Sequence, residues 1–201
     1  MPRAFYYLSI LFLGCGGSSH GLGVPGECGV FTPCGGAIEG TWKITSYCLA
    51  GSVASTSSTC SVTVAMSNIQ VSGTLVFASD STYSTSTVQS GTMNLTYAQS
   101  CLTDSNLTCA KISATTKGDA GISLSCASNA AGDCACAEDL NNVASNEKGT
   151  YSTSGNSLAM VKTGATKAPD PTEYCVQGNT LTIHSTSATS SGSATLVATR
   201  Q

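Results

Sequence analysis

Charged side chains are scarce in this chain of 201 residues, in which Lys and Arg number 8, Asp and Glu number 11, and the four types together make up 9%. Soluble proteins carry about 25% charged residues. With a net charge of −3 the chain offers no basic surface for phosphates, so we expect no nucleic-acid partner. Disorder is also excluded, because it combines low hydrophobicity with high net charge, whereas 41% of these residues are hydrophobic.

Long hydrophobic runs and long helical patterns are missing as well. The N-terminal apolar run extends only from Ala4 to Leu13 before glycines and serines end it, whereas a membrane-spanning helix needs about 20 apolar residues. No segment keeps a helical period for about ten residues, and no longer repeat is visible. These absences exclude a transmembrane anchor, a helical bundle and a repeat protein.

The N-terminus has the pattern of an export signal. Arg3 precedes the apolar run, and Gly14 places a small residue before Cys15, as in a secretory signal with its cleavage point. With cysteine directly after the small residue, the segment resembles the signal of bacterial lipoproteins. The resemblance implies that residues 1–14 are removed and that acyl chains on Cys15 hold the mature chain on a membrane. A cleaved signal without a lipid is the alternative.

The same resemblance bears on location and on domain organisation. Gly16, rather than Asp, follows Cys15, which implies the outer membrane, with the protein facing either the periplasm or the exterior. Residues 15–36 are rich in Gly and Ser and are expected to form a flexible tether. Residues 37–201 are expected to form one folded domain, which we expect to be monomeric.

Cysteine is the one reactive residue type in abundance. Of 11 cysteines, ten remain after Cys15, and an even number in an exported chain indicates a disulfide framework. The C-x-C pair at Cys134 and Cys136 lacks both the C-x-x-C spacing of structural zinc sites and a nearby histidine, so we expect no metal. The candidates for disulfides are Cys28, Cys34, Cys48, Cys60, Cys101, Cys109, Cys126, Cys134, Cys136 and Cys175.

The pairing of these cysteines cannot be read from the sequence, so only the cheapest loops are offered as hypotheses. Closing a short loop costs little chain entropy, which favours Cys48 with Cys60 and Cys101 with Cys109. Cys28 and Cys34 stand at the end of the tether and are expected to fasten it to the domain.

The rest of the chain alternates between apolar and polar residues, which is typical of half-buried strands. In the first strand, Trp42, Ile44, Ser46 and Cys48 share one face and Tyr47 the other. Further strands are expected at 60–66, 71–77, 93–97, 122–126, 149–154, 158–160, 174–176, 181–183 and 194–198.

Turn residues complete the prediction of an all-β fold. Gly155-Asn156 and Gly178-Asn179 are hairpin signals between neighbouring strands. Residues 99–119 break the alternation and are expected to form a disulfide-tied loop with a helical turn around 110–114. Evenly spaced short strands predict an antiparallel barrel of about 8–10 strands, with a sandwich as the alternative.

Two segments of the domain resemble lipocalins. Gly40-Thr41-Trp42 matches the Gly-x-Trp at the start of the lipocalin barrel, and Tyr174–Ile183 is similar to a late hairpin of bacterial lipocalin-like domains. The resemblance implies that Arg200 lies over Trp42, so that Gly40, Trp42 and Arg200 close the barrel. Taken whole, the chain resembles lipocalin-like (calycin-type) lipoproteins of Gram-negative bacteria.

No residue set predicts catalysis, so we expect neither an enzyme nor a cofactor. His184 falls on the polar side of its strand, and pairing it with Asp170 or Glu173 and one of many serines identifies no particular nucleophile. Asp133, Glu138 and Asp139 are interpreted as a solvated acidic turn, because they lack the spacing of a calcium loop.

Three functions stay open at this stage. The first is a barrel that holds a small apolar or amphipathic ligand at its mouth; we favour a lipocalin-like envelope lipoprotein, with ligand binding as a hypothesis. The second is a structural or interaction lipoprotein whose barrel is filled by its own side chains. The third is an inhibitor of secreted hydrolases.

Overall fold

A computed structural model of the chain describes residues 28–50, 53–56, 61–104, 107–115, 121–165, 170–186 and 193–201. The expected signal peptide at 1–14, Cys15, Cys60 and the tether up to residue 27 lie outside the described residues.

Strands dominate these residues, as the alternation predicts. The strands are β1 (Gly40–Ala50), β2 (Val53–Thr56), β3 (Ser61–Phe77), β4 (Thr82–Tyr97), β5 (Ile122–Ser128), β6 (Cys134–Ser154), β7 (Ser157–Lys162), β8 (Thr172–Gln177), β9 (Thr180–Thr186) and β10 (Ser193–Arg200). The helices are α1 (Gln99–Asp104) and α2 (Cys109–Thr115), both within the expected loop of residues 99–119.

Eight of the strands close into a ring. Its order is β1-β3-β4-β6-β7-β8-β9-β10, and β10 returns to pair with β1. All of these pairings are antiparallel, and apart from β2 and β5, which lie outside the ring, each strand follows its neighbour along the chain. The expected antiparallel barrel is therefore confirmed. The hairpins at Gly155-Asn156 and Gly178-Asn179 join β6 to β7 and β8 to β9, with φ of 59° and 57° at the two glycines.

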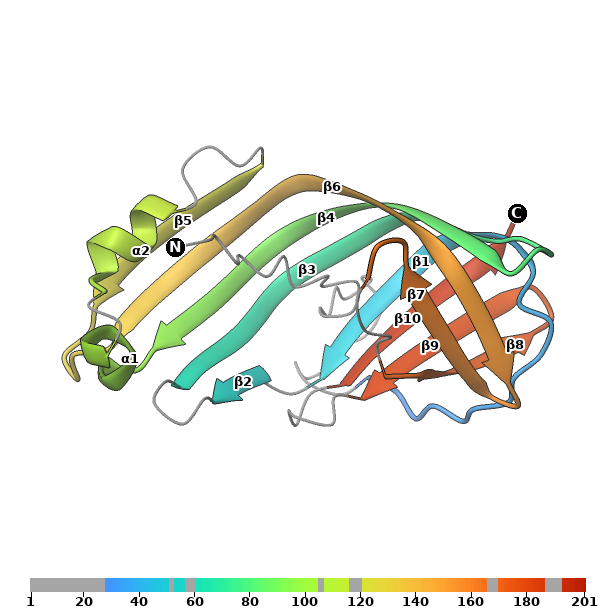
Figure 1. Cartoon of the computed structure of the whole chain (residues 1–201), viewed down its shortest axis with the longest axis horizontal. Coiled ribbons are helices and arrows are strands. Elements are labelled where there is room, and N and C mark those ends of the chain that lie inside the picture. Colours follow the sequence, from blue (N-terminus) through green and yellow to red (C-terminus); the bar gives the residue numbers. More distant parts are fainter. Residues whose placement is uncertain are drawn as a thin grey trace.

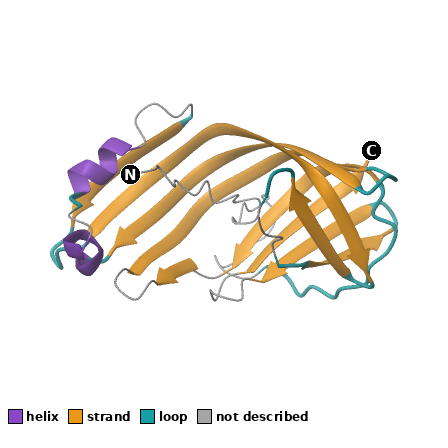
Figure 2. Cartoon of the chain, viewed as in Figure 1, coloured by secondary structure: helices purple, strands orange, loops and turns teal. Residues whose placement is uncertain are grey.

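Three ring strands extend far beyond the barrel. β3, β4 and β6 have 17, 16 and 21 residues, and their outer parts form a curved sheet with β2 and β5 at its edges. Figure 1 shows this extension reaching away from the ring toward α1 and α2, and Figure 2 shows both helices at that end. We call β2, β5, α1, α2 and these outer strand parts the extension. Neither described helix is long and apolar enough to cross a membrane.

Bulges in all three long strands lie where the extension leaves the barrel. The β3–β4 register shifts between Ser67 and Gln70, and the β4–β6 register shifts between Gln89 and Gly91. Asn68, Gly91 and Asn142 have φ of 54°, 142° and 52°. A bulge leaves one residue unpaired and bends its strand, which redirects the sheet. The sequence pattern predicts two strands, 60–66 and 71–77, where the structure has one strand with a bulge.

A bulge in β1 corrects the predicted facing of its second half. The β1–β10 register shifts between Ile44 and Ser46, so the alternation changes phase there. Tyr47 and Leu49, rather than Ser46 and Cys48, point into the core and are buried. A one-residue shift moves every later side chain to the opposite face.

The predicted acidic turn is also wrong. Glu138 and Asp139 lie inside β6, which begins at Cys134 and pairs with β4 on one side and β5 on the other. The Asp139 carboxylate accepts a hydrogen bond from the Thr92 hydroxyl across the strands at 2.8 Å. Pairing with two neighbouring strands outweighs the weak strand preference of these acidic residues.

Four disulfides join described residues, and Cys101 is also disulfide-bonded, which confirms the framework. Cys28–Cys48 and Cys34–Cys175 fasten the segment before β1 to the barrel, where Gly35 also pairs with Cys175. The other two, Cys109–Cys134 and Cys126–Cys136, lie in the extension.

The two local pairings proposed from the sequence are wrong, because Cys48 bonds to Cys28 and Cys109 bonds to Cys134. Loop entropy favours short loops, but the sheet brings distant cysteines together and decides the outcome. Cys34 and Cys175 are 141 residues apart. In the chain-entropy model, a disulfide that closes a loop of that length stabilises the folded state by about 5 kcal/mol, because it restricts the unfolded chain.

Candidate functional site

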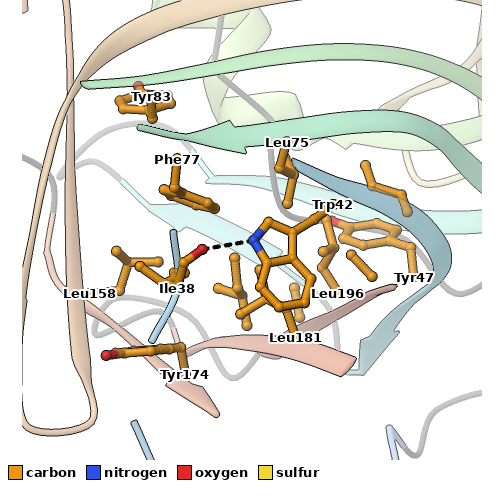
Figure 3. Packing of buried hydrophobic residues seen from close by; sticks show 14 of the residues in the cluster. Ile38, Trp42, Tyr47, Leu75, Phe77, Tyr83, Leu158, Tyr174, Leu181 and Leu196 are labelled. Atoms are coloured by element: carbon orange, nitrogen blue, oxygen red, sulfur yellow. Dashed lines mark hydrogen bonds between the residues drawn. The ribbon is translucent and has the colours of Figure 1, made fainter. Parts of the chain in front are cut away.

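One end of the barrel is closed around Trp42. The indole is fully buried, and its Nε1 donates a hydrogen bond to the Ile38 carbonyl at 2.7 Å. Figure 3 shows Phe77, Leu181 and Leu196 among the side chains gathered about it. A tryptophan facing inward from the first strand places the largest apolar side chain in the barrel, with its one polar atom satisfied.

The structure brings Gly40, Trp42 and Arg200 together at this end. The Arg200 guanidinium carbon lies 4.2 Å from the centroid of the Trp42 ring, and the group donates hydrogen bonds to the carbonyls of Glu39 (2.6 Å) and Ala37 (3.1 Å). A Cβ at Gly40 would meet Arg200 Nη1 at 2.6 Å, so the guanidinium needs the glycine. The three residues form a seal that links the last strand to the first.

Small residues do not open a space near this seal. Ala194 and Ala198, which could either leave a cavity or fit a taper, are 1% and 0% exposed and lie in the same cluster as Trp42. Leu181 and Leu196 of the two C-terminal strands belong to that cluster as well. Side chains of the barrel itself therefore fill the closed end.

A hollow of about 360 Å³ lies where the seam between β1 and β3 ends. The β1–β3 pairing stops at Lys43↔Thr74, and beyond it β1 continues along β10. The hollow borders the bulges of the long strands, and its lining is Thr45, Ser46, Tyr47, Ile69, Gln70, Val71, Ser72, Val88, Ser90 and Asn142.

Tyr47 is the unusual residue of this lining. Its side chain is only 4% exposed, and its hydroxyl finds no hydrogen-bond partner among the described residues. Burial raises the pKa of the Tyr47 hydroxyl far above its ordinary value, so it stays protonated and can donate. Ile69, which is also buried, supplies an apolar wall, and Figure 3 shows Tyr47 beside Trp42 inside the barrel.

The polar part of the lining comes from the bulged strands. Ser90 Oγ accepts a hydrogen bond from the Asn142 backbone N–H at 3.1 Å and lies 3.3 Å from Asn142 Oδ1, which it reaches as a donor. Gln70 and Ser72 add further polar groups. The hollow thus combines an apolar wall with polar groups, an arrangement that can hold a small amphipathic molecule, and the Tyr47 hydroxyl lies covered behind this lining.

The prediction that His184 is a solvated surface residue is wrong, because its ring contacts neighbouring side chains. It is half-buried, its ring stacks on Phe31 with centroids 5.0 Å apart, and Nδ1 lies 2.9 Å from Thr195 Oγ1. Glu173 is its cross-strand neighbour. The partners of His184 are thus an aromatic ring and the Thr195 hydroxyl.

The acidic residues considered for calcium do not converge. Asp133 accepts a hydrogen bond from the Gln99 backbone N–H at 3.1 Å and so closes the turn next to α1. Glu138 and Asp139 are adjacent in β6 and point to opposite faces of the sheet.

Sequence reasoning missed Tyr47 and Ile69. The phase of the alternation places Tyr47 outside, and only the bulge after Ile44 turns it inward. Ile69 falls in the predicted gap between two strands, beside Asn68, which has a positive φ. Asn adopts positive φ more readily than most residues, so an asparagine at this position is the weak sequence signal of a bulge. No protein-family model, curated protein or solved structure matches the chain.

Proposed function

We propose that this protein is an envelope-anchored lipoprotein, held through acyl chains on Cys15, whose lipocalin-like barrel binds a small amphipathic ligand in the hollow beside Tyr47. The export pattern of residues 1–14, the even cysteine set and the Trp42–Arg200 seal support the first part. The buried, unpaired hydroxyl of Tyr47 carries the second part.

An unpaired donor in the core needs an explanation. Leaving a buried hydroxyl without a partner costs about 1–3 kcal/mol. A ligand that brings a carbonyl or carboxylate oxygen to Tyr47 recovers this free energy, while its apolar part covers Ile69 and Val71. A volume of about 360 Å³ is near the lower end of the range of about 300–1,000 Å³ for ligand pockets, so the ligand is small.

Native mass spectrometry of the protein, purified with gentle detergent from its own envelope, tests this function. We expect a small molecule to co-purify with the parent protein and to be absent from the Tyr47→Phe variant. Thr85→Val is the matched control, because Thr85 also has a buried hydroxyl with no partner among the described residues but does not line the hollow. Repeated preparations without any bound molecule, or equal retention in both variants, would refute ligand binding here.

A structural or inhibitory role is the second candidate, and the extension favours it. Three strands continue well beyond what the barrel needs, and two disulfides and two helices stiffen their far end. Rigid, disulfide-tied surfaces of this kind bind other proteins with little loss of conformational entropy. Inhibition of one enzyme in a panel of secreted hydrolases, with loss of inhibition after deletion of residues 99–119, would identify this role.

Anchoring is tested separately by the intact mass of the mature chain before and after reduction. We expect the mass of a chain that begins at Cys15 and carries acyl chains on this residue. Reduction should add the mass of two hydrogens for each disulfide. A mature chain that begins elsewhere, without lipid, would leave the barrel unanchored.

A further inference from the structure

Two disulfides of the extension lie against each other. Cys134 and Cys136 are on the same face of β6, and their sulfur atoms are 3.8 Å apart although each is bonded to a different partner. The sulfurs of Cys126, Cys134 and Cys136 all lie within 4.8 Å of one another. Cys109, bonded to Cys134, brings a fourth sulfur to this group. We call these four residues the sulfur cluster.

One separation in the sulfur cluster, that between Cys134 and Cys136, is that of a thiolate metal site. With a Zn–S bond of about 2.3 Å, the sulfur atoms of a tetrahedral site are about 3.8 Å apart. Cys134 and Cys136 already have this separation. After reduction, the Cys126 sulfur must move away from that of Cys136, whereas the Cys109 sulfur, which lies outside the group of three, must leave that of Cys134 and turn toward the other ligands.

We propose that the sulfur cluster is a redox-controlled metal site, which is closed as two disulfides and binds one thiophilic d¹⁰ cation, Zn²⁺ or Cu⁺, when it is reduced. The C-x-C spacing alone predicts disulfides, and that interpretation holds for the oxidised chain. In the reduced chain the third and fourth ligands come from α2 and β5, which sequence spacing does not bring together.

The chemistry needs a dithiol reductant. Two dithiol molecules reduce Cys109–Cys134 and Cys126–Cys136 by thiol–disulfide exchange and become two disulfides themselves, so that four electrons and four protons reach the protein as four thiols. One Zn²⁺ then binds the four sulfurs and releases four protons, leaving a tetrathiolate of charge −2. Oxidation by a disulfide of the same class reverses the sequence and expels the ion.

The surroundings suit such a site. Cys134 and Cys136 are buried at 0% and 4% exposure, and an apolar shell that includes Leu95 and Ile112 packs around them. The Ser128 hydroxyl donates a hydrogen bond to Cys109 Sγ at 3.5 Å, a contact that stabilises a thiolate. Three of the ligands are on paired strands, which hold them in place with or without the disulfides.

Titration of the full chain with Co²⁺ under a phosphine reductant and without oxygen tests the proposal. Co²⁺ in a tetrahedral thiolate site shows strong visible absorption and a sulfur-to-metal charge-transfer band. We expect one Co²⁺ per chain in the reduced protein, displacement by Zn²⁺ with release of protons, and no binding by the oxidised protein. Far-UV circular dichroism of the reduced chain before metal addition reports whether the sheet persists.

Two variants make the result specific. Cys34→Ser/Cys175→Ser removes a disulfide outside the sulfur cluster and should bind Co²⁺ as the parent does. Cys109→Ser leaves three of the four sulfurs and should weaken binding at least tenfold while shifting the charge-transfer band. Equal binding by Cys109→Ser and the parent, equal binding by the chain unfolded in urea, or no binding by the reduced chain would overturn the proposal.

Discussion

The seal at the closed end of the barrel makes a sharp prediction about Arg200. Arg200→Ala removes a guanidinium 4.2 Å from the Trp42 centroid and two hydrogen bonds to the carbonyls of Glu39 and Ala37. The cation–π contact is worth about 0.5–2 kcal/mol. Since water can replace the guanidinium at these exposed carbonyls, we assign each hydrogen bond about 0.5–1 kcal/mol, the lower part of the usual range.

The free energy of unfolding should therefore fall by about 1.5–4 kcal/mol in Arg200→Ala, which corresponds to about 3–16 °C in Tm for a domain of this size. Arg200→Lys should lose about half as much, because an ammonium keeps the charge but cannot stack flat and reach both carbonyls. Urea unfolding followed by tryptophan emission is the assay, and Trp42 is the only tryptophan in the chain.

A double-mutant cycle with Gly40→Ala tests the mechanism. The added Cβ would lie 2.6 Å from Arg200 Nη1 and push the guanidinium off the indole, so Gly40→Ala should cost less when Arg200 is already alanine. We expect a coupling free energy of at least about 1 kcal/mol, as for residues in contact. Strictly additive effects, or an Arg200→Ala variant as stable as the parent, would refute the proposed seal.

Two further predictions concern strand geometry and pH. Gly73→Ala should lower the free energy of unfolding by several kcal/mol, because the added Cβ would lie 2.0 Å from the Ser86 carbonyl oxygen at a φ of 136°. Gly155→Ala, with a φ of 59° and open space around it, should lower it by only about 1–2 kcal/mol. Equal losses of the two variants in urea unfolding would contradict close contact between the strands at Gly73. Burial raises the pKa of Tyr47 in the folded chain above the ordinary 10.0, so below about pH 10 both states keep the proton and stability is unaffected. Above it the unfolded chain loses the proton first, and stability should fall by up to about 1.4 kcal/mol per pH unit for this group. Tyr47→Phe should make the slope of the free energy of unfolding against pH shallower by the equivalent of about one proton. An unchanged slope would show that Tyr47 ionises normally.

Local signals in the sequence predict the fold class and several of its details. Alternation gives the strands, and Gly155 and Gly178 mark hairpin turns because a glycine adopts positive φ without strain. The Gly-x-Trp pattern directs attention to Trp42, whose inward facing follows from its phase in the first strand. The disulfide framework follows from an even count of cysteines.

The remaining features depend on pairing between distant strands, which no local pattern records. The β1 bulge reverses the facing of Tyr47, so the hollow could not be located from the alternation. The first part of β6 carries Glu138 and Asp139, whose weak strand preference is offset by pairing on both sides. The partners of Cys48 and Cys109 depend on which segments the sheet places side by side.

The order of the ring has a consequence for how the chain folds. Five of the eight ring contacts join strands that are consecutive along the chain, and two more, β1–β3 and β4–β6, pass over a single strand, so these seven can form one after another. The eighth, between β1 and β10, brings together segments about 150 residues apart along the chain. Contacts between segments so far apart form slowly, because closing the long loop costs chain entropy before the contacts that stabilise it have formed. Closure of this seam should limit the folding rate, and a circular permutant that joins residue 201 to residue 28 through a linker and opens the chain at the β6–β7 turn should fold faster.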